Sequence, residues 1–89
     1  MEKSIHTLEY SILRAELVSI RKNAGLTQRD VAQRLKVPPS WIAKVETGER
    51  RLDFIELCKL LSACGVEPLP FLKTALKSFA AVKRRRAED

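Results

Sequence analysis

Apolar residues recur at helical spacing along most of the chain. Leu13, Leu17, Ile20 and Ala24 follow one another at steps of four, three and four, which places them on one face of a helix. No stretch alternates apolar and polar residues for long enough to predict a strand. The pattern therefore predicts an all-α fold of five helices, and the length of 89 residues predicts one domain over residues 1–89.

Capping residues and glycines set the limits of the first two helices. We expect the first from about Thr7 to Ala24, because Gly25 can supply the left-handed residue that follows a helix. The second opens with Thr27-Gln28-Arg29-Asp30, a capping-box pattern in which Asp replaces the more usual Glu. Val31, Ala32 and Leu35 form its apolar side, and we expect the helix to end near Leu35.

Two adjacent prolines precede the third helix. Pro39 suits the first helical position, because the N–H that proline lacks would have no partner there. The same proline holds Pro38 extended. Ile42 and Val45 are expected to face inward, and Thr47-Gly48 ends the helix.

The fourth helix begins after Leu52, with a second capping box at Asp53-Phe54-Ile55-Glu56, and Gly65 ends it. The fifth helix begins at Pro68 and runs to about residue 83, followed by a flexible basic tail at 84–89. We expect the core within residues 7–66. The predicted buried side of the fourth helix consists of Phe54, Leu57, Leu60, Leu61 and Cys64.

The charged residues are unevenly distributed along the chain. The chain carries a net charge of +6, and residues 21–51 hold eight basic and three acidic residues. A basic patch of this kind favours a polyanionic partner, nucleic acid before membrane. No signal peptide is visible and no apolar run approaches membrane length, so a cytoplasmic protein is expected.

Few residues suit catalysis or metal binding. Cys58 and Cys64 lie six apart without a paired histidine, which fits neither a zinc site nor a redox pair, so we interpret them as small buried hydrophobic residues. His6 is the only histidine, and no carboxylate pair or nucleophile–base set emerges. We expect no enzyme, no metal and no cofactor.

Two short helices joined by a tight turn within a basic patch are typical of a DNA reader. The stretches IRKNAGLTQRDVAQRL and VPPSWIAKVETGERRLDFIELCKLL go further. They contain an arginine late in the first helix, G-L-T-Q at the start of the second and an E-x-G-x-R-x-L ending. Over about residues 13–66 the chain resembles the lambda-repressor-like helix-turn-helix family of phage Cro and repressor proteins and bacterial xenobiotic response element (XRE) regulators.

The resemblance implies roles for three residues around the third helix. Arg21 and Glu46 match the internal ion pair of the family, which supports the reading helix without touching bases. Gln28 matches a glutamine that contacts a phosphate and often braces the reading helix. Free N–H groups at a helix start also attract phosphate, which agrees with that placement.

The third helix departs from the family pattern. Relatives commonly carry serine, glutamine and serine or threonine where this chain has Pro38, Pro39 and Ala43. Proline lacks the amide with which glutamine reads adenine. We therefore expect the base-reading residues to be Ser40, Trp41 and Lys44.

Trp41 has two interpretations. We expect it at the surface, where its ring would meet a thymine methyl group or a sugar edge. The alternative is that the ring covers the core between the second and third helices.

Phosphate contacts are expected from the turn after the third helix, where we predict free backbone N–H groups beside two guanidinium groups. Two further cations from the second helix and the turn after it would complete the rim. With Gln28, the expected phosphate-binding residues are Arg29, Lys36, Gly48, Arg50 and Arg51.

The fifth helix has a wider apolar stripe than one core contact needs. We expect a homodimer through this helix, because paired reading helices reach successive major grooves; the alternative is that it only covers the domain. The basic run at residues 83–86 is either a DNA-binding arm or a solvated end. The expected dimer residues are Leu69, Leu72, Leu76 and Phe79.

The sequence thus predicts a bacterial or phage-encoded regulator of transcription, a dimeric repressor that inserts residues 39–47 into the major groove of double-stranded DNA. The alternative is an antitoxin or other protein-binding module on the same fold, which the loss of the usual readers at Pro39 and Ala43 favours. The basic patch and the retained Gln28, Lys44, Arg50 and Arg51 favour DNA.

Overall fold

The computed structural model describes residues 7–88, with side chains as far as residue 83. Residues 1–6 and 89, which belong to the expected domain, lie outside this description, and so does His6. The described chain forms five helices and no strand, so the expected all-α fold is confirmed. They are α1 (Leu8–Asn23), α2 (Gln28–Leu35), α3 (Pro39–Thr47), α4 (Phe54–Ala63) and α5 (Pro68–Glu88).

Local sequence signals account for the helix starts. The side chains of Thr27 and Asp30 form the first predicted capping box, and those of Asp53 and Glu56 form the second. Pro39 occupies the first turn of α3, behind an extended Pro38 that provides no side-chain cap. These starts agree with the sequence prediction because caps depend on neighbours within one turn.

α2 ends at Leu35, where the sequence predicted, but the conformation of the next residue was not foreseen. Lys36, the C-cap, adopts left-handed angles (φ 60°, ψ 43°), and the N–H of Val37 donates to the carbonyl oxygen of Ala32 at 3.0 Å. A residue other than glycine is uncommon in this region. The left-handed residue keeps the connection to α3 as short as the helix-turn-helix requires.

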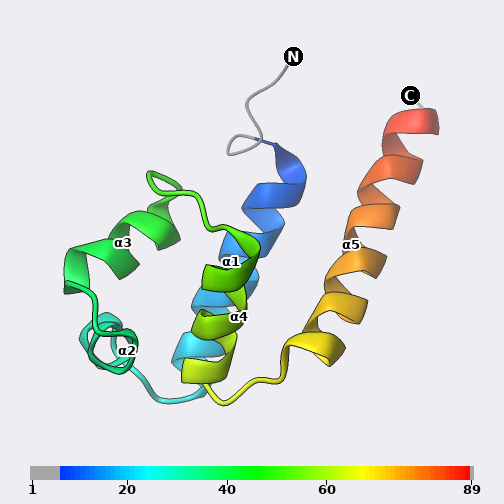
Figure 1. Cartoon of the computed structure of the whole chain (residues 1–89). Helices are drawn as coiled ribbons and strands as arrows, with labels where there is room; N and C mark the ends of the chain where they lie inside the picture. The colour runs from blue at the N-terminus through cyan, green and yellow to red at the C-terminus, as the bar shows by residue number, and fades with distance from the viewer. Residues whose placement is uncertain (1–6, 89) are drawn as a thin grey trace.

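Figure 1 shows α1 and α4 in the middle of the molecule, with α2 and α3 on one side and α5 on the other. α1 contacts both α3 and α5, and α4 contacts both α2 and α5. The core lies where these helices meet, and its most completely buried side chains are Val31, Ile42, Val45 and Leu61. Cys64 is buried as expected, whereas Cys58 is only half-buried.

The prediction that Phe54 belongs to the core is wrong. Phe54 is 65% exposed, and Ile55 beside it is 64% exposed. Exposure falls along α4, because Leu57 is half-buried and Leu60 and Leu61 are buried. The first turn of α4 therefore lies beyond the edge of the core, a position that a helical pattern alone does not reveal.

α5 contributes to the core and extends past the expected end. Phe71 and Ala75 are members of the buried cluster, so the core is not confined to residues 7–66. Leu72 and Phe79, expected at a dimer contact, pack partly against this cluster. α5 continues to Glu88, so residues 84–88 are helical where a flexible tail was expected.

Candidate nucleic-acid interface

The exposed face of α3 carries two of the three expected base readers. Ile42 and Val45 are buried at 1% exposure, which turns the opposite side of the helix to solvent. Ser40 and Lys44 are exposed there, four residues and about one helical turn apart. Their hydroxyl and ammonium groups are free to approach a base edge or a phosphate.

Trp41 differs from its expected placement. Its ring is half-buried and packs against the core cluster, and the guanidinium carbon of Arg50 lies 4.9 Å from the ring centroid. The structure therefore agrees more closely with the alternative, in which the ring covers the core. The edge that remains accessible lies in the first turn of α3, the part of a reading helix that approaches bases.

Glu46 is the centre of a network that joins three helices. Arg21 Nε donates to its Oε2 at 2.6 Å and Arg21 Nη2 to its Oε1 at 3.0 Å. Gln28 Nε2 donates to the same Oε1 at 2.9 Å. The hydrogen bonding of the Arg21 guanidinium to the Glu46 carboxylate is the main cause that raises the pKa of Arg21. The ion pair is thus present, and Gln28, expected at a phosphate, braces the pair in the free protein.

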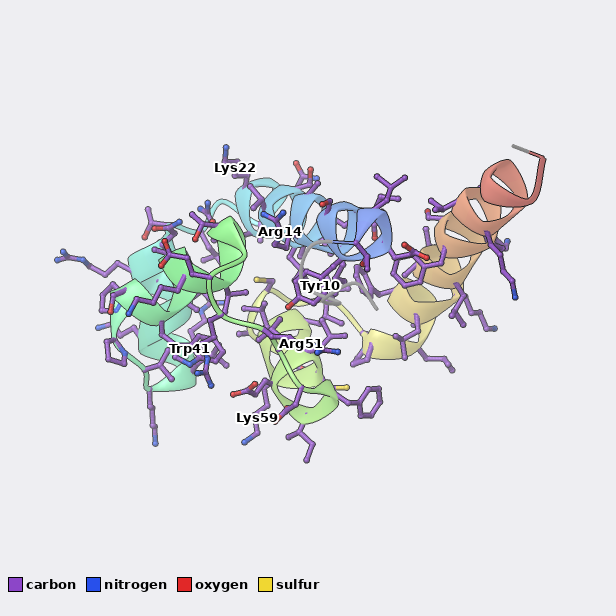
Figure 2. The ribbon with its side chains drawn as sticks, turned by 90° about the horizontal axis from the view of Figure 1, so that it is seen from above. Tyr10, Arg14, Lys22, Trp41, Arg51 and Lys59 are labelled. Atoms are coloured by element: carbon purple, nitrogen blue, oxygen red, sulfur yellow. The ribbon has the colours of Figure 1, made fainter. Side chains whose placement is uncertain are left out.

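Arg14 also contacts the carboxyl end of α3, a role that was not predicted from the sequence. Its Nη1 donates to the backbone oxygen of Glu46 at 3.4 Å, and its guanidinium lies against Gly48. Figure 2 shows Arg14 on α1 facing the loop that follows α3. Arg14 and Arg21 are seven residues apart, so they share one face of α1. That spacing was a signal available in the sequence.

The turn after α3 does not offer the row of free N–H groups that was expected. The N–H of Gly48 donates to the oxygen of Val45 at 3.2 Å, and that of Arg50 donates to Lys44 at 3.0 Å. The helix end satisfies these donors itself. Neither of these two backbone N–H groups is therefore free in the way that the sequence predicted.

The cationic side chains of the expected rim are placed differently from one another. Arg29, Lys36 and Arg51 are exposed. Arg50 instead donates from Nη2 to Glu56 Oε2 at 2.9 Å while it covers Trp41. Arg50 is therefore held between Trp41 of α3 and Glu56 of α4. The other three cations form no ion pair with any of the described side chains.

Two further contacts fix the elements around α3. The hydroxyl of Tyr10 accepts a hydrogen bond from the N–H of Leu52 at 3.0 Å, which ties α1 to the loop before α4. Arg34 Nη1 donates to the oxygen of Ala63 at 2.7 Å, which ties α2 to the last turn of α4. A cation at the carboxyl end of a helix is also favoured by the helix dipole.

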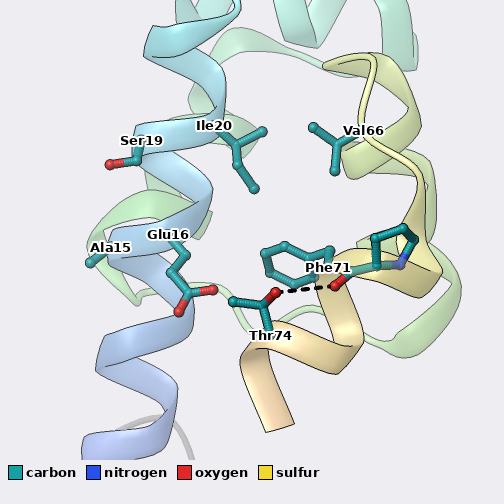
Figure 3. Close-up of a pocket in the computed structure, with 8 residues that line it drawn as sticks. Ala15, Glu16, Ser19, Ile20, Val66, Phe71 and Thr74 are labelled. Carbon is teal, nitrogen blue, oxygen red and sulfur yellow. Dashed lines mark hydrogen bonds between the residues drawn. The ribbon is translucent and has the colours of Figure 1, made fainter. Parts of the chain in front are cut away.

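An apolar groove lies on the far side of α1 from α3. It encloses about 610 Å³ between α1 and α5 (Figure 3). Ile20, Val66 and Phe71 form its apolar lining, and Glu16 and Thr74 lie at its side. The hydroxyl of Thr74 already has a partner within α5, because it donates to the backbone oxygen of Pro70 at 3.3 Å.

Other kinds of site are not formed by the described residues. Among the side chains of residues 7–83, no three histidine, cysteine or acidic groups lie together so that they could hold a metal ion. No helix within residues 7–88 has the length and apolar character needed to cross a membrane.

Comparison with known proteins agrees with this geometry. Residues 12–70 match the family model described as a helix-turn-helix domain. Among solved structures, the chain is similar to an XRE-family like protein from Pseudomonas syringae pv. tomato str. DC3000. The two share 36% sequence identity with a TM-score of 0.79, over 84% of this chain and 92% of that one. The search of curated proteins gave no match. The chain therefore belongs to the XRE-like helix-turn-helix family of DNA-binding regulators.

Proposed function

We propose that the protein is a sequence-specific transcriptional repressor that inserts α3 into the major groove of its operator. The observation that carries this proposal is the exposed pair Ser40 and Lys44 on a helix whose end is held by Arg21 through Glu46. A rigid helix with donors on its outer face suits base reading, because specificity requires fixed positions. Such a role belongs in the cytoplasm of a bacterium or of a phage host.

Lys44 and Ser40 are the base readers in this proposal, with the accessible edge of Trp41 beside them. Lys44 can address guanine O6 and N7, and the Trp41 edge can contact a thymine methyl group. Arg29, Lys36 and Arg51 are exposed cations that would contact phosphates and set the register of the protein on DNA. Gln28, at the start of α2, donates from its side-chain amide to Glu46 and so braces α3. In this proposal it also contacts a phosphate.

The repressor would act as a homodimer through α5. Leu69 and Leu76 are 64% and 63% exposed and lie seven residues apart, on one face of the helix. Exposed leucines at this spacing favour contact with a second copy of the helix. Two copies would place their α3 helices about 34 Å apart, in successive major grooves.

The experiment that tests the function is selection of bound duplexes from a random DNA pool at two salt concentrations. We expect an enriched inverted repeat with half-sites about one helical turn apart. Lys44→Ala should relax the preference at one base position, at a cost of about 1–3 kcal/mol. Lys77→Ala on α5 is the matched control, since it removes the same charge far along the chain from α3.

Two results would contradict the proposal. One is salt-sensitive binding without an enriched sequence, which would mean that only phosphates are contacted. The other is a chain that binds no duplex at all. Either would favour the second candidate function, an antitoxin or other protein-binding module. That candidate is supported by the prolines and Ala43 on α3, which replace the usual polar readers.

A further inference from the structure

Arg50 and Trp41 form a contact that the expected role of Arg50 does not explain. Trp41 lies in the first turn of α3, and Arg50, nine residues later, lies in the loop after the end of that helix. The guanidinium carbon nevertheless lies 4.9 Å from the centroid of the indole ring. A guanidinium over an aromatic face at this distance is an attractive cation–π arrangement.

The position of Arg50 is set from two directions. Its backbone N–H donates to the oxygen of Lys44 at 3.0 Å, which fixes the main chain against the last turns of α3. Its Nη2 donates to Glu56 Oε2 at 2.9 Å, and the side chains are 43% and 27% exposed. An isolated ion pair this exposed contributes little to the free energy of unfolding. Its effect is to hold the guanidinium of Arg50 in one position.

Glu56 is itself held in place by the start of α4. Its Oε1 accepts from the N–H of Asp53 at 3.0 Å, and its N–H donates to Asp53 Oδ1 at 2.7 Å. One carboxylate oxygen thus caps α4 while the other holds Arg50. The rigid capping box therefore orients the guanidinium, which in turn covers the ring of Trp41.

The ring of Trp41 is enclosed by more than Arg50. It lines a cavity of about 170 Å³ together with Leu35 and Val37 near the turn before α3, and with Glu56 and Lys59 of α4. A change in the side-chain angles of Trp41 would move its accessible edge and disturb the first turn of α3. Glu46 anchors the last turn of the same helix, so the two contacts hold opposite ends.

We propose that Arg50 is a positioning residue, which clamps Trp41 against α4 through Glu56 and thereby fixes the first turn of the reading helix. This inference rests on the proposed function where it concerns DNA, and on the structure alone where it concerns Trp41. It assigns Arg50 a role other than the phosphate contact expected from the sequence. Arg51, exposed and next in the chain, keeps its proposed role as a phosphate contact.

The first test uses the fluorescence of Trp41, which is the only tryptophan in the chain. Arg50→Ala should shift the emission to longer wavelength and increase quenching by acrylamide, because the ring loses its cover. Glu56→Gln should act in the same direction while its amide oxygen still caps α4. Arg51→Ala, the matched control, should leave both quantities unchanged. Equal spectra for Arg50→Ala and Arg51→Ala would overturn the proposal.

The second test measures affinity for the selected duplex as a function of salt. Arg50→Ala should weaken binding by about tenfold, because Trp41 and the first turn of α3 are then no longer held in place before DNA binds and must be ordered on binding. The slope of log K against log salt should stay unchanged, whereas Arg51→Ala should reduce it by about 0.9. Arg50→Lys keeps the charge and should still bind weakly, because ammonium does not reproduce the planar stack.

The two tests separate the possible failures. Full recovery in Arg50→Lys, with a reduced slope in Arg50→Ala, would make Arg50 a phosphate contact and overturn the proposal. Thermal unfolding followed by circular dichroism establishes that each variant is folded before it is compared. If the wild-type chain binds no duplex, the proposed function fails, yet the fluorescence series still decides whether Arg50 clamps Trp41.

Discussion

Arg21 on α1 donates two hydrogen bonds to the carboxylate of Glu46 on α3, one from Nε at 2.6 Å and one from Nη2 at 3.0 Å. The same guanidinium donates from Nη1 to the oxygen of Leu26 at 2.9 Å, so its three nitrogen atoms are all engaged. A planar fork held at every nitrogen allows little rotation. The pair therefore fixes where the last turn of α3 lies relative to α1, whatever it contributes to stability.

Glu46→Ala should destabilise the protein by about 2–3 kcal/mol, because the side chain of Arg21, only 12% exposed, would keep its charge without a carboxylate. Glu49→Ala, an exposed acidic residue just after α3, should change stability by less than about 0.5 kcal/mol. Urea unfolding measures both. The double variant Arg21→Ala/Glu46→Ala should lose less than the sum of the single changes. Equal losses for Glu46→Ala and Glu49→Ala would contradict a supporting role for the pair.

Gly48→Ala should cost more than Gly25→Ala, although both glycines have left-handed angles, with φ of 86° and 72°. Each substitution places a side chain in a conformation that costs about 1 kcal/mol. A Cβ on Gly48 would also lie 3.0 Å from the guanidinium carbon of Arg14, while nothing lies within 4 Å at Gly25. Displacing Arg14 from the oxygen of Glu46 should add about 0.5–1 kcal/mol.

Urea unfolding in a second background isolates that contact. With Arg14→Ala in place, Gly48→Ala and Gly25→Ala should cost the same, because the obstructing guanidinium is gone. A larger cost at Gly48 that persists in the Arg14→Ala background would show that Arg14 is not the cause.

Local signals in the sequence were sufficient for the helix starts. The capping boxes at Thr27 and Asp53 and the proline at position 39 each act within one turn, and each helix begins where they predicted. The ion pair of Arg21 followed from the family resemblance. By contrast, the left-handed Lys36 had no local signal, since lysine is not favoured in that conformation.

Side-chain partners between helices were harder to predict. The placement of Arg50 over Trp41 depends on where Glu56 of α4 lies, and no spacing in the sequence reports that distance. The exposure of Phe54 depends on where the core ends along α4, which helical periodicity does not specify. Arg14 is an intermediate case, because its register with Arg21 was visible although its target was not.

Leu76→Glu should convert a dimer to a monomer without lowering the stability of the fold by more than about 0.5 kcal/mol, because this side chain is 63% exposed. A buried carboxylate at an apolar contact between two α5 helices would be strongly unfavourable. Sedimentation equilibrium at several concentrations measures the association. Ile55→Glu, at a residue 64% exposed on α4, is the matched control and should leave the dimer intact. A wild-type chain that stays monomeric at high concentration would refute the α5 dimer.

The two cysteines should react at different rates with iodoacetamide. Cys64 is buried, and burial raises the pKa of its thiol, so little of the reactive thiolate is present at neutral pH. Cys58 is only half-buried and should be modified first. Mass spectrometry of a time course identifies the modified residue, and the Cys58→Ser variant should react slowly until urea unfolds it. Equal rates in the folded protein would contradict the burial of Cys64.

Asp30 should make the stability of the protein depend on pH in the acid range. The pKa of this carboxyl group is lowered from its ordinary value of 3.8, chiefly because the backbone N–H of Thr27 donates to it at 2.8 Å. The unfolded chain therefore binds this proton more readily than the folded one. The contribution of Asp30 to stability is then present above the ordinary pKa and is lost as pH falls through the lowered one.

Asp30→Asn isolates this contribution, because it removes the charge while keeping the size of the side chain. The variant should be less stable than the wild type at pH 7, since the carboxylate also lies in the first turn of α2, where the helix dipole favours negative charge. Urea unfolding at steps from pH 7 to about pH 2.5 should show the two free energies of unfolding converging as pH falls through the carboxyl range. A difference that stays constant over this range would mean that the charge of Asp30 adds nothing to the capping box. A difference that grows on acidification would mean that the pKa shift has the opposite sign.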